Sequence, residues 1–287
     1  MLPIPKTPKC YVGGAFIRSE SGAVAPLHSA DGAFLCNIPQ CTRKDLRNAV
    51  EAAAKAGSWA KRTAYNKGQI LYRLAEMLES RAAEMAAAIS IASPAHGAPA
   101  SAGIDEVRAA IDRIVHYAGW TDKYQPLLGG VNPVSTPHFN FTITEPVGIT
   151  GIIAPDAFPL LALLSLILPA IATGNTVVAL ASETNPCPAI LFGEILAVSD
   201  LPGGVVNLLT GKRADLLPTF ATHAHLRSLS AAVSPHEATL LQQGAAESVK
   251  RVTLHPLDTD WPSSSAQGLH HLRHHVELKT TWHPAAL

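Results

Sequence analysis

The sequence predicts an α/β fold built on a parallel sheet. Apolar segments typical of buried strands occur at 147–153, 176–181 and 205–210, and helical segments separate them. This alternation implies right-handed crossovers between parallel strands. Hydrophobic residues make up 47% of the 287 residues and charged residues only 15%, so the chain can bury a large core.

Residues 1–125 are predicted to form short strands followed by three helices. Glycine and proline recur through residues 10–40, which indicates short strands and turns. Thr42 is placed to cap the first helix, because Asp45 three residues later resembles the end of a capping box. The second helix would end at Ser93-Pro94. Apolar spacing assigns this helix to 65–92, a loop of small residues to 94–103, and the third helix to 104–123.

Residues 126–146 combine a loop with a strand of alternating polarity. The alternation from His138 to Thr144 predicts a half-exposed strand, which either packs one face on the domain or pairs with another chain. The last segment, 258–287, begins with a linker over 258–268. Residues 275–282 alternate again and predict a terminal strand.

Residues 147–257 hold the predicted parallel strands and their helices. Pro169 is expected to break an apolar helix over 158–173, and His223 and His225 are expected to lie in a loop. The other predicted elements are helices at 187–199 and 234–247 and a fourth strand at 250–254.

Composition excludes several classes of protein. Lys+Arg and Asp+Glu both number 22, which argues against a basic nucleic-acid binder, and the low charge favours self-association. Prolines interrupt the apolar stretch around 158–172, so we expect no membrane span. The four cysteines have no CxxC spacing and the first six residues lack an apolar signal segment. Together these observations predict a cytoplasmic, reducing location.

Four motifs in the same order resemble the aldehyde dehydrogenase superfamily. They are YAGWTDK at 117–123, EPVGITGII at 145–153, LPAIATGNTVV at 168–178 and LPGGVVNLLTG at 201–211. The resemblance covers about residues 10–256 and the terminal strand, and implies a Rossmann-type coenzyme domain with amino-terminal helices. It also implies an oligomerisation arm made from the two alternating strands. A homo-oligomer would then form through Phe139, Phe141, Ile143, Val276 and Leu278.

The resemblance also reveals what this chain lacks. Family members insert a large catalytic domain, which carries the nucleophilic cysteine, before the last arm strand. Here Leu254 is followed by only a short segment before that strand, and no cysteine follows Cys187. The catalytic domain is therefore expected to be missing.

Residues matching the family's coenzyme and catalytic positions have changed. Ala157 stands where an asparagine helps to hold the oxyanion, and Leu180 stands where a lysine is expected. The glycine-rich turn matches 232–237, where Pro235 removes an N–H donor that could face a pyrophosphate. His255 replaces the general base. Pro155 and Glu183 remain as candidate cofactor-binding residues.

The chain resembles the second, non-catalytic half of the family 16 aldehyde dehydrogenases. This predicts a non-catalytic module for oligomerisation or partner binding, with no cofactor expected and NAD(P) binding only as a weak alternative. A second hypothesis is that the chain belongs to an NAD(P)-dependent aldehyde dehydrogenase whose catalytic residues lie in another half or subunit. A third is a residual nucleotide binder.

Several side chains allow both a functional and a structural interpretation. Glu183 either binds a ribose or is a solvent-facing carboxylate, and His255 either acts as a base or is a surface histidine. Cys187, between two prolines at a helix start, is either an activated or a structural thiol. Asp156 is explained by turn capping. The spacing of four histidines allows metal ligation on a helix, although no third ligand is evident: His270, His271, His274 and His275.

Overall fold

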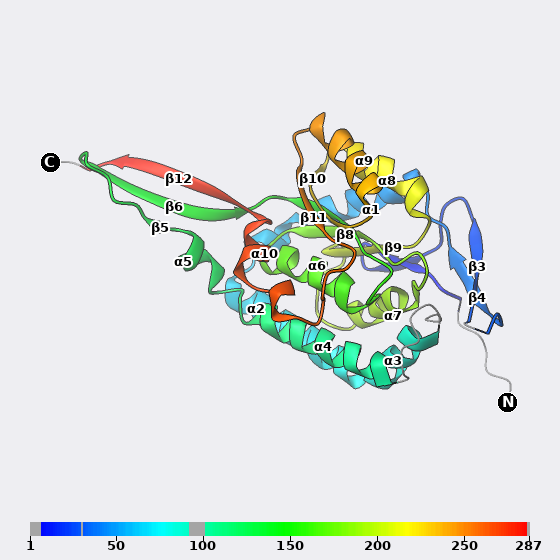
Figure 1. Cartoon of the computed structure of the whole chain (residues 1–287). Helices are drawn as coiled ribbons and strands as arrows, with labels where there is room; N and C mark the ends of the chain where they lie inside the picture. The colour runs from blue at the N-terminus through cyan, green and yellow to red at the C-terminus, as the bar shows by residue number, and fades with distance from the viewer. Residues whose placement is uncertain (1–6, 30, 92–100, 286–287) are drawn as a thin grey trace.

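A seven-stranded sheet forms the centre of the molecule. The computed structural model describes residues 7–29, 31–91 and 101–285. The strand order is β11-β10-β7-β8-β9-β1-β2, with the first five strands parallel (Figure 1). The parallel strands are β7 (Ile149–Ile153), β8 (Thr176–Leu180), β9 (Val206–Leu209), β10 (Leu226–Ala232) and β11 (Arg251–His255); the antiparallel edge is β1 (Cys10–Val12) and β2 (Ala15–Ile17).

Helices cover both faces of this sheet, and each face has its own apolar cluster. One face carries α1 (Arg43–Lys55), α8 (Arg213–Thr222) and α9 (Pro235–Ala246). The other carries α6 (Leu161–Ala172) and α7 (Cys187–Leu196), with a further layer of helices outside them. That layer contains α2 (Ala64–Ser80), α3 (Ala82–Ile91) and α4 (Ser101–Ala118).

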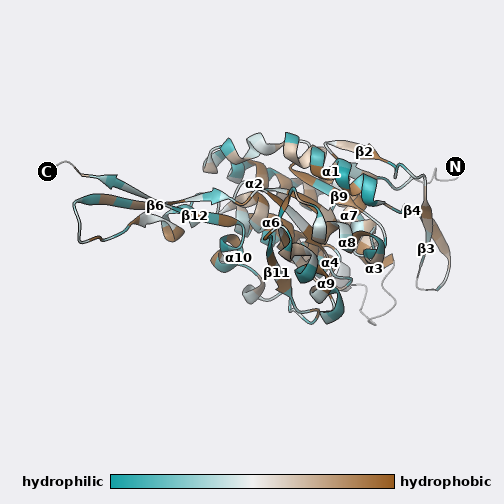
Figure 2. Cartoon of the chain, turned by 90° about the horizontal axis from the view of Figure 1, so that it is seen from above, coloured by the Kyte–Doolittle hydropathy of each residue, from teal (hydrophilic) through white to brown (hydrophobic). Residues whose placement is uncertain are grey.

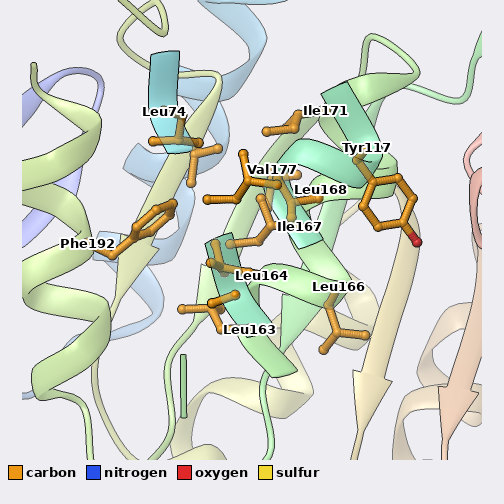
Figure 3. Packing of buried hydrophobic residues seen from close by; sticks show 14 of the residues in the cluster. Leu74, Tyr117, Leu163, Leu164, Leu166, Ile167, Leu168, Ile171, Val177 and Phe192 are labelled. Carbon is orange, nitrogen blue, oxygen red and sulfur yellow. The ribbon is translucent and has the colours of Figure 1, made fainter. Parts of the chain in front are cut away.

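Helix α6 is the centre of the larger cluster, and all twelve of its residues are buried (Figure 3). The prediction that Pro169 breaks this helix is wrong, because the helix runs through it to Ala172. A proline inside a helix costs about 3 kcal/mol, and burial of leucine and isoleucine side chains on all sides offsets that cost.

The amino-terminal helices differ from the prediction in their boundaries. The helix predicted over 65–92 is two helices, with a break at Arg81, whose guanidinium pairs with Glu84 and with Glu194 of α7. Helix α4 begins at Ser101, so the predicted loop over 94–103 is too long. The predicted stop at Ser93-Pro94 and the six residues at the amino terminus lie outside the described residues. The capping box of Thr42 and Asp45 is confirmed.

Two elements between β9 and α9 were not predicted. Residues 213–222 form α8 and residues 226–232 form β10, which lies between β7 and β11 in the sheet. His223 and His225 lie in the connection between them, as predicted. The predicted fourth strand is therefore the fifth parallel strand.

The segment 258–268, which was predicted to be a linker, packs on the body of the molecule. Trp261 is only 1% exposed, and Arg113 donates hydrogen bonds to its carbonyl oxygen at 2.7 Å and to that of Ala266 at 2.5 Å. The segment contains the short helix η2 (Ser264–Ala266) and leads into α10 (Leu269–Arg273). A buried guanidinium that meets carbonyl oxygens satisfies groups that burial would otherwise leave unpaired.

A long arm projects from one end of the body, and a hairpin projects from the other (Figures 1 and 2). The arm pairs β6 (His138–Pro146) with β12 (Val276–Pro284) in antiparallel register along nine residues, and β5 (Gly130–Val131) adds a short third strand. The hairpin pairs β3 (Val24–His28) with β4 (Phe34–Pro39). Two further short helices complete the described elements: η1 (Gly57–Lys61) and α5 (Tyr124–Leu128). Helix α5 begins two residues before the segment predicted as loop and strand over 126–146 and runs into it.

Candidate functional site

The carboxyl ends of the five parallel strands meet at one edge of the sheet. Ligands of open α/β sheets bind outside this edge. Pro155 and Glu183 lie there, in the turns after β7 and β8. Pro155 is buried, whereas Glu183 is exposed. The fold therefore brings both predicted cofactor-binding residues to the same edge.

Asp156 organises the turn beside Glu183. Its Oδ1 accepts hydrogen bonds from Ser182 Oγ at 2.8 Å and from the backbone N–H groups of Glu183 and Thr184 at 2.9 and 3.1 Å. Burial opposes ionisation of this carboxyl, but the Arg213 guanidinium and these donors hold its pKa below the usual range. The turn-capping interpretation of Asp156 agrees with these contacts.

Arg213 is the residue of this site that sequence reasoning missed. Its Nη2 lies 2.8 Å from Asp156 Oδ1 and 3.2 Å from the carbonyl oxygen of Ala154, and only 12% of the side chain is exposed. The backbone N–H of Arg213 donates to Glu183 Oε2 at 2.9 Å. Two carboxylates from neighbouring turns thus converge on one residue at the start of α8. The signal was two cations, Lys212 and Arg213, directly after the third predicted strand.

The positions expected to contact coenzyme carry few polar groups. Leu180 is fully buried in the apolar cluster beneath α1, so its side chain does not reach the edge. Ala157 has no side-chain donor. Helix α9 begins with Ser234 and Glu237 in a capping box, and Pro235 at its first position has no N–H. Glu183 is the residue whose carboxylate can accept hydrogen bonds from a ribose.

His255 is not the surface histidine that was predicted. Its ring lies 5.6 Å from that of Trp261 and stacks on that of His271 at 5.7 Å, and Ser230 Oγ lies 3.3 Å from its Nε2. Burial lowers the pKa of His255 to about 4, and also that of His271 to about 4. At neutral pH both rings are uncharged. Across residues 7–29, 31–91 and 101–285, no group of three or more His, Cys, Asp or Glu side chains is arranged to hold a metal ion.

Cys187 does not have the depressed pKa that its place at a helix start suggested. Burial raises the pKa of this thiol to about 12, and the nearby Cys36 adds to the effect. The thiol is therefore protonated at neutral pH, and the structural interpretation holds.

Comparison with known proteins decides the family. The aldehyde dehydrogenase family model matches residues 16–255. The chain belongs to the aldehyde dehydrogenase family. It is 34% identical over 267 residues to retinal dehydrogenase 2 of Gallus gallus, covering 88% of this chain and 50% of that protein. It is 31% identical over 257 residues to cytosolic 10-formyltetrahydrofolate dehydrogenase of Mus musculus, covering 85% of this chain and 28% of that protein.

Solved aldehyde dehydrogenases have the same fold as this chain. The aldehyde dehydrogenase of Bacillus cereus, solved as an NAD⁺ complex, superposes with a TM-score of 0.82 at 26% identity, covering 87% of this chain and 50% of that one. The enzyme of Brucella melitensis biovar abortus 2308 superposes with a TM-score of 0.83 at 25% identity, covering 89% of this chain and 53% of that one. The α/β prediction with a mostly parallel sheet is confirmed. The chain spans half of the length of retinal dehydrogenase 2, 28% of that of the formyltetrahydrofolate dehydrogenase and about half of that of the two solved enzymes.

No helix within the described part of the chain combines the length and the apolar character that crossing a bilayer requires.

Proposed function

We propose that this chain is a non-catalytic aldehyde dehydrogenase module that acts through self-association or partner binding. The observation that carries the proposal is the direct passage from β11 to β12. Residues 256–275 join these strands, and β12 still pairs with β6 along its whole length. The arm is thus completed without the large domain that carries the nucleophilic cysteine in the family.

The chemistry available to the described side chains supports the same proposal. Oxidation of an aldehyde through a thiohemiacetal requires a thiolate. Burial raises the pKa of Cys187 to about 12 and also raises that of Cys36. Cys10 and Cys41 are 2% and 5% exposed, which leaves no room for an aldehyde substrate at either sulfur. Loss of a nucleophile that acts within a catalytic unit costs on the order of 10⁶ in rate, and loss of one oxyanion donor about 10²–10³. The missing nucleophile is therefore the larger effect.

The arm supplies a surface for association, although the five predicted residues do not form one face. Residues opposite each other in an antiparallel pair project to the same side. Phe139, Phe141 and Ile143 alternate along β6 and share one side, while Leu278 lies opposite Thr144 on the other side. Val276 is 3% exposed and belongs to the larger apolar cluster of this chain, so it is not part of the proposed surface.

The Phe139 side of the arm is the stronger candidate for contact between copies. Phe139 is 49% exposed and Ile143 38% exposed, and the rings of Phe139 and Phe141 lie 5.4 Å apart. A contiguous apolar strip at this level of exposure is typical of a protein contact. We propose a homo-oligomer in which this strip is covered.

Sedimentation of the purified chain, together with an aldehyde oxidation assay, tests the proposal. We expect a dimer or larger species at micromolar concentration and no aldehyde-dependent reduction of NAD⁺ or NADP⁺. A monomer at that concentration would remove the association role. Turnover that survives Cys187→Ser and a second purification step would contradict the non-catalytic role.

A second candidate function is binding of NAD(P) without catalysis. It is favoured by Glu183, an exposed carboxylate at the end of β8, and by the matched relatives, one of which is described as an NAD⁺ complex. The residues present fit the ribose better than the phosphates, since Pro235 removes one N–H from α9. Titration calorimetry with NAD⁺ tests it. Binding that Glu183→Gln weakens would support this candidate, and absence of heat at millimolar NAD⁺ would exclude it.

A further inference from the structure

The fold brings all four cysteines into two pairs, although they are far apart in sequence. Cys10 Sγ and Cys41 Sγ lie 3.3 Å apart, and these residues are 2% and 5% exposed. The thiols of Cys36 and Cys187 are close enough to affect each other's pKa, and both residues are partly exposed. All four are free thiols. Neither pair serves the coenzyme edge described above.

The Cys10–Cys41 pair lies at the base of the β3–β4 hairpin. Cys10 begins β1, and Cys41 follows β4 after one intervening residue. The N–H of Cys41 donates to the carbonyl oxygen of Thr210 at 3.0 Å, and Thr210 Oγ1 donates to that of Pro39 at 2.6 Å. Cys10 Sγ also lies 3.4 Å from Thr210 Oγ1. Thr210 therefore contacts both sides of the pair, through the backbone next to Cys41 and through the side chain of Cys10.

The electrostatics of the pair favour reaction at Cys10. The hydrogen bond from the Cys41 thiol lowers the pKa of Cys10 below its usual value, despite the opposing effect of burial. The same interaction raises the pKa of Cys41. Cys10 is therefore the more easily deprotonated of the two sulfur atoms 3.3 Å apart, which is the arrangement of an attacking and a resolving thiol.

We propose that Cys10 and Cys41 are a thiol modification site at which a hydroperoxide produces an intrachain disulfide. The Cys10 thiolate attacks the terminal peroxide oxygen, the O–O bond breaks, and Cys10 becomes a sulfenic acid while the other oxygen leaves as hydroxide from hydrogen peroxide or as alkoxide from an organic hydroperoxide. The Cys41 sulfur then attacks the Cys10 sulfur, the S–O bond breaks, and the departing hydroxyl takes the Cys41 proton as water. Two electrons pass from the thiols to the peroxide.

The disulfide would fasten the returning strand of the hairpin to the sheet. The hairpin residues Ala25, Leu27 and Ile38 line a small cavity of about 60 Å³ together with Ser182 and Glu183. Among the described elements, β3 and β4 pair mainly with each other, so their base is the principal attachment to the body. Oxidation would thus restrain the hairpin beside the turn that carries Glu183.

The second thiol pair provides the matched comparison. Cys187 lines an open cavity of about 580 Å³ with Phe16, Arg18 and Leu191, so a reagent reaches it from solvent. The double variant Cys36→Ser, Cys187→Ser retains only the proposed pair. Its counterpart, Cys10→Ser, Cys41→Ser, retains only the more exposed pair.

The experiment treats the full chain and both double variants with hydrogen peroxide, followed by thiol alkylation in denaturant and non-reducing peptide mapping. For the variant that retains Cys10 and Cys41, we expect loss of both thiols, a mass lower by two hydrogen atoms, and a peptide linking Cys10 to Cys41. The same linked peptide is expected from the unmodified full chain, which provides the answer if a variant does not fold.

Three outcomes would overturn the proposal. The first is that Cys10 and Cys41 remain alkylatable after peroxide treatment that oxidises an exposed model thiol. The second is that Cys10 gains oxygen atoms and stops at a sulfinic acid with Cys41 still free. The third is that the disulfides formed join two chains, which a non-reducing gel would reveal as a covalent dimer.

Discussion

The guanidinium of Arg213 lies 2.8 Å from the carboxylate of Asp156, and this ion pair joins the turn after β7 to the first residue of α8. Asp156 simultaneously accepts hydrogen bonds from the turn after β8. Three connections at the carboxyl edge of the sheet thus depend on one carboxylate. The pair lies at the carboxyl edge of the sheet, beside the turn that carries Glu183.

Replacing Asp156 with asparagine is expected to lower the free energy of unfolding. The amide removes the charge that pairs with the largely buried Arg213, and a hydrogen bond to a charged group contributes about 1.5–3 kcal/mol. Because 34% of the Asp156 side chain is exposed, solvent screening reduces the expected loss to about 1–2 kcal/mol. Urea unfolding, monitored by circular dichroism, measures this loss in the free energy of unfolding. Asp258→Asn, at an exposed position, is the matched control, and an equal loss in both variants would contradict the role of the pair.

Replacing Arg113 with methionine is expected to release the segment 256–268. Arg113 is 3% exposed and donates to Ser165 Oγ, Trp261 O and Ala266 O, so its removal leaves buried oxygen atoms unpaired. Each such atom costs about 1–3 kcal/mol, and we expect a loss of about 3 kcal/mol together with faster proteolysis of this segment. Arg113→Lys should not restore it, because an ammonium lacks the planar fork.

Arg108 provides the control for this prediction, since it lies on the same helix with an exposed side chain paired to Asp105. Arg108→Met should change the free energy of unfolding by less than about 0.5 kcal/mol. If the two methionine variants unfold alike, the hydrogen bonds of Arg113 do not hold the segment.

The chain is expected to lose stability as the pH falls below about 6.5, because buried histidines must stay neutral in the folded state. Burial lowers the pKa of His275 to about 3, from 6.5 in the unfolded chain, and its Nδ1 has no partner. Between these values the unfolded state binds more protons, so stability is complete above 6.5 and declines toward pH 3. Each such histidine contributes a slope of about 1.4 kcal/mol per pH unit.

His275→Leu isolates this effect. The variant should lose about 2 kcal/mol less than the parent chain between pH 7 and pH 5, because one titrating group has been removed. Guanidinium unfolding at a series of pH values measures the slope. His236→Leu, at an exposed position, is the matched control for replacing a histidine, and equal slopes for parent and His275→Leu would contradict the assignment.

Charge placed on the Phe139 side of the arm is expected to dissociate oligomers. Phe139→Lys together with Ile143→Lys would leave unpaired charges in any contact that covers this strip, and such charges are costly to bury. Sedimentation should move toward the monomer while circular dichroism is unchanged. Leu278→Lys on the opposite side separates the two faces, since dissociation by this variant alone would assign the contact to the other side.

Much of the fold could be predicted because it depends on local pattern. The buried strands at β7, β8 and β9, the capping box of Thr42 and the alternating arm strands all follow from residues close together in sequence. The elements that were not predicted depend instead on contacts with residues that are distant in the sequence. Strand β10 is buried but rich in serine and alanine, and its hydroxyls are satisfied by partners such as Thr150, which bonds Ser228 at 2.8 Å. The residues near β10 in the sequence do not indicate that its hydroxyl groups have such partners.

The candidate site was predictable only in part. The changes at Ala157, Leu180 and His255 could be identified from matched motifs, and Glu183 lies at the expected edge. The burial of His255 against Trp261 depends on a segment that returns from further along the chain, held by Arg113 from α4. Spacing in the sequence does not show which later segment of the chain will pack against a given residue.

By itself, the sequence determined the family and the parallel sheet, and it predicted changes at the family's coenzyme and catalytic positions, because periodicity and motif identity are local properties of the chain. Only the tertiary structure decided which side chains meet. It paired Arg213 with Asp156 and Cys10 with Cys41, and it separated Leu278 from Phe139 on opposite sides of the arm. These relationships depend on strand order and register, which set the distance between residues that lie far apart in sequence.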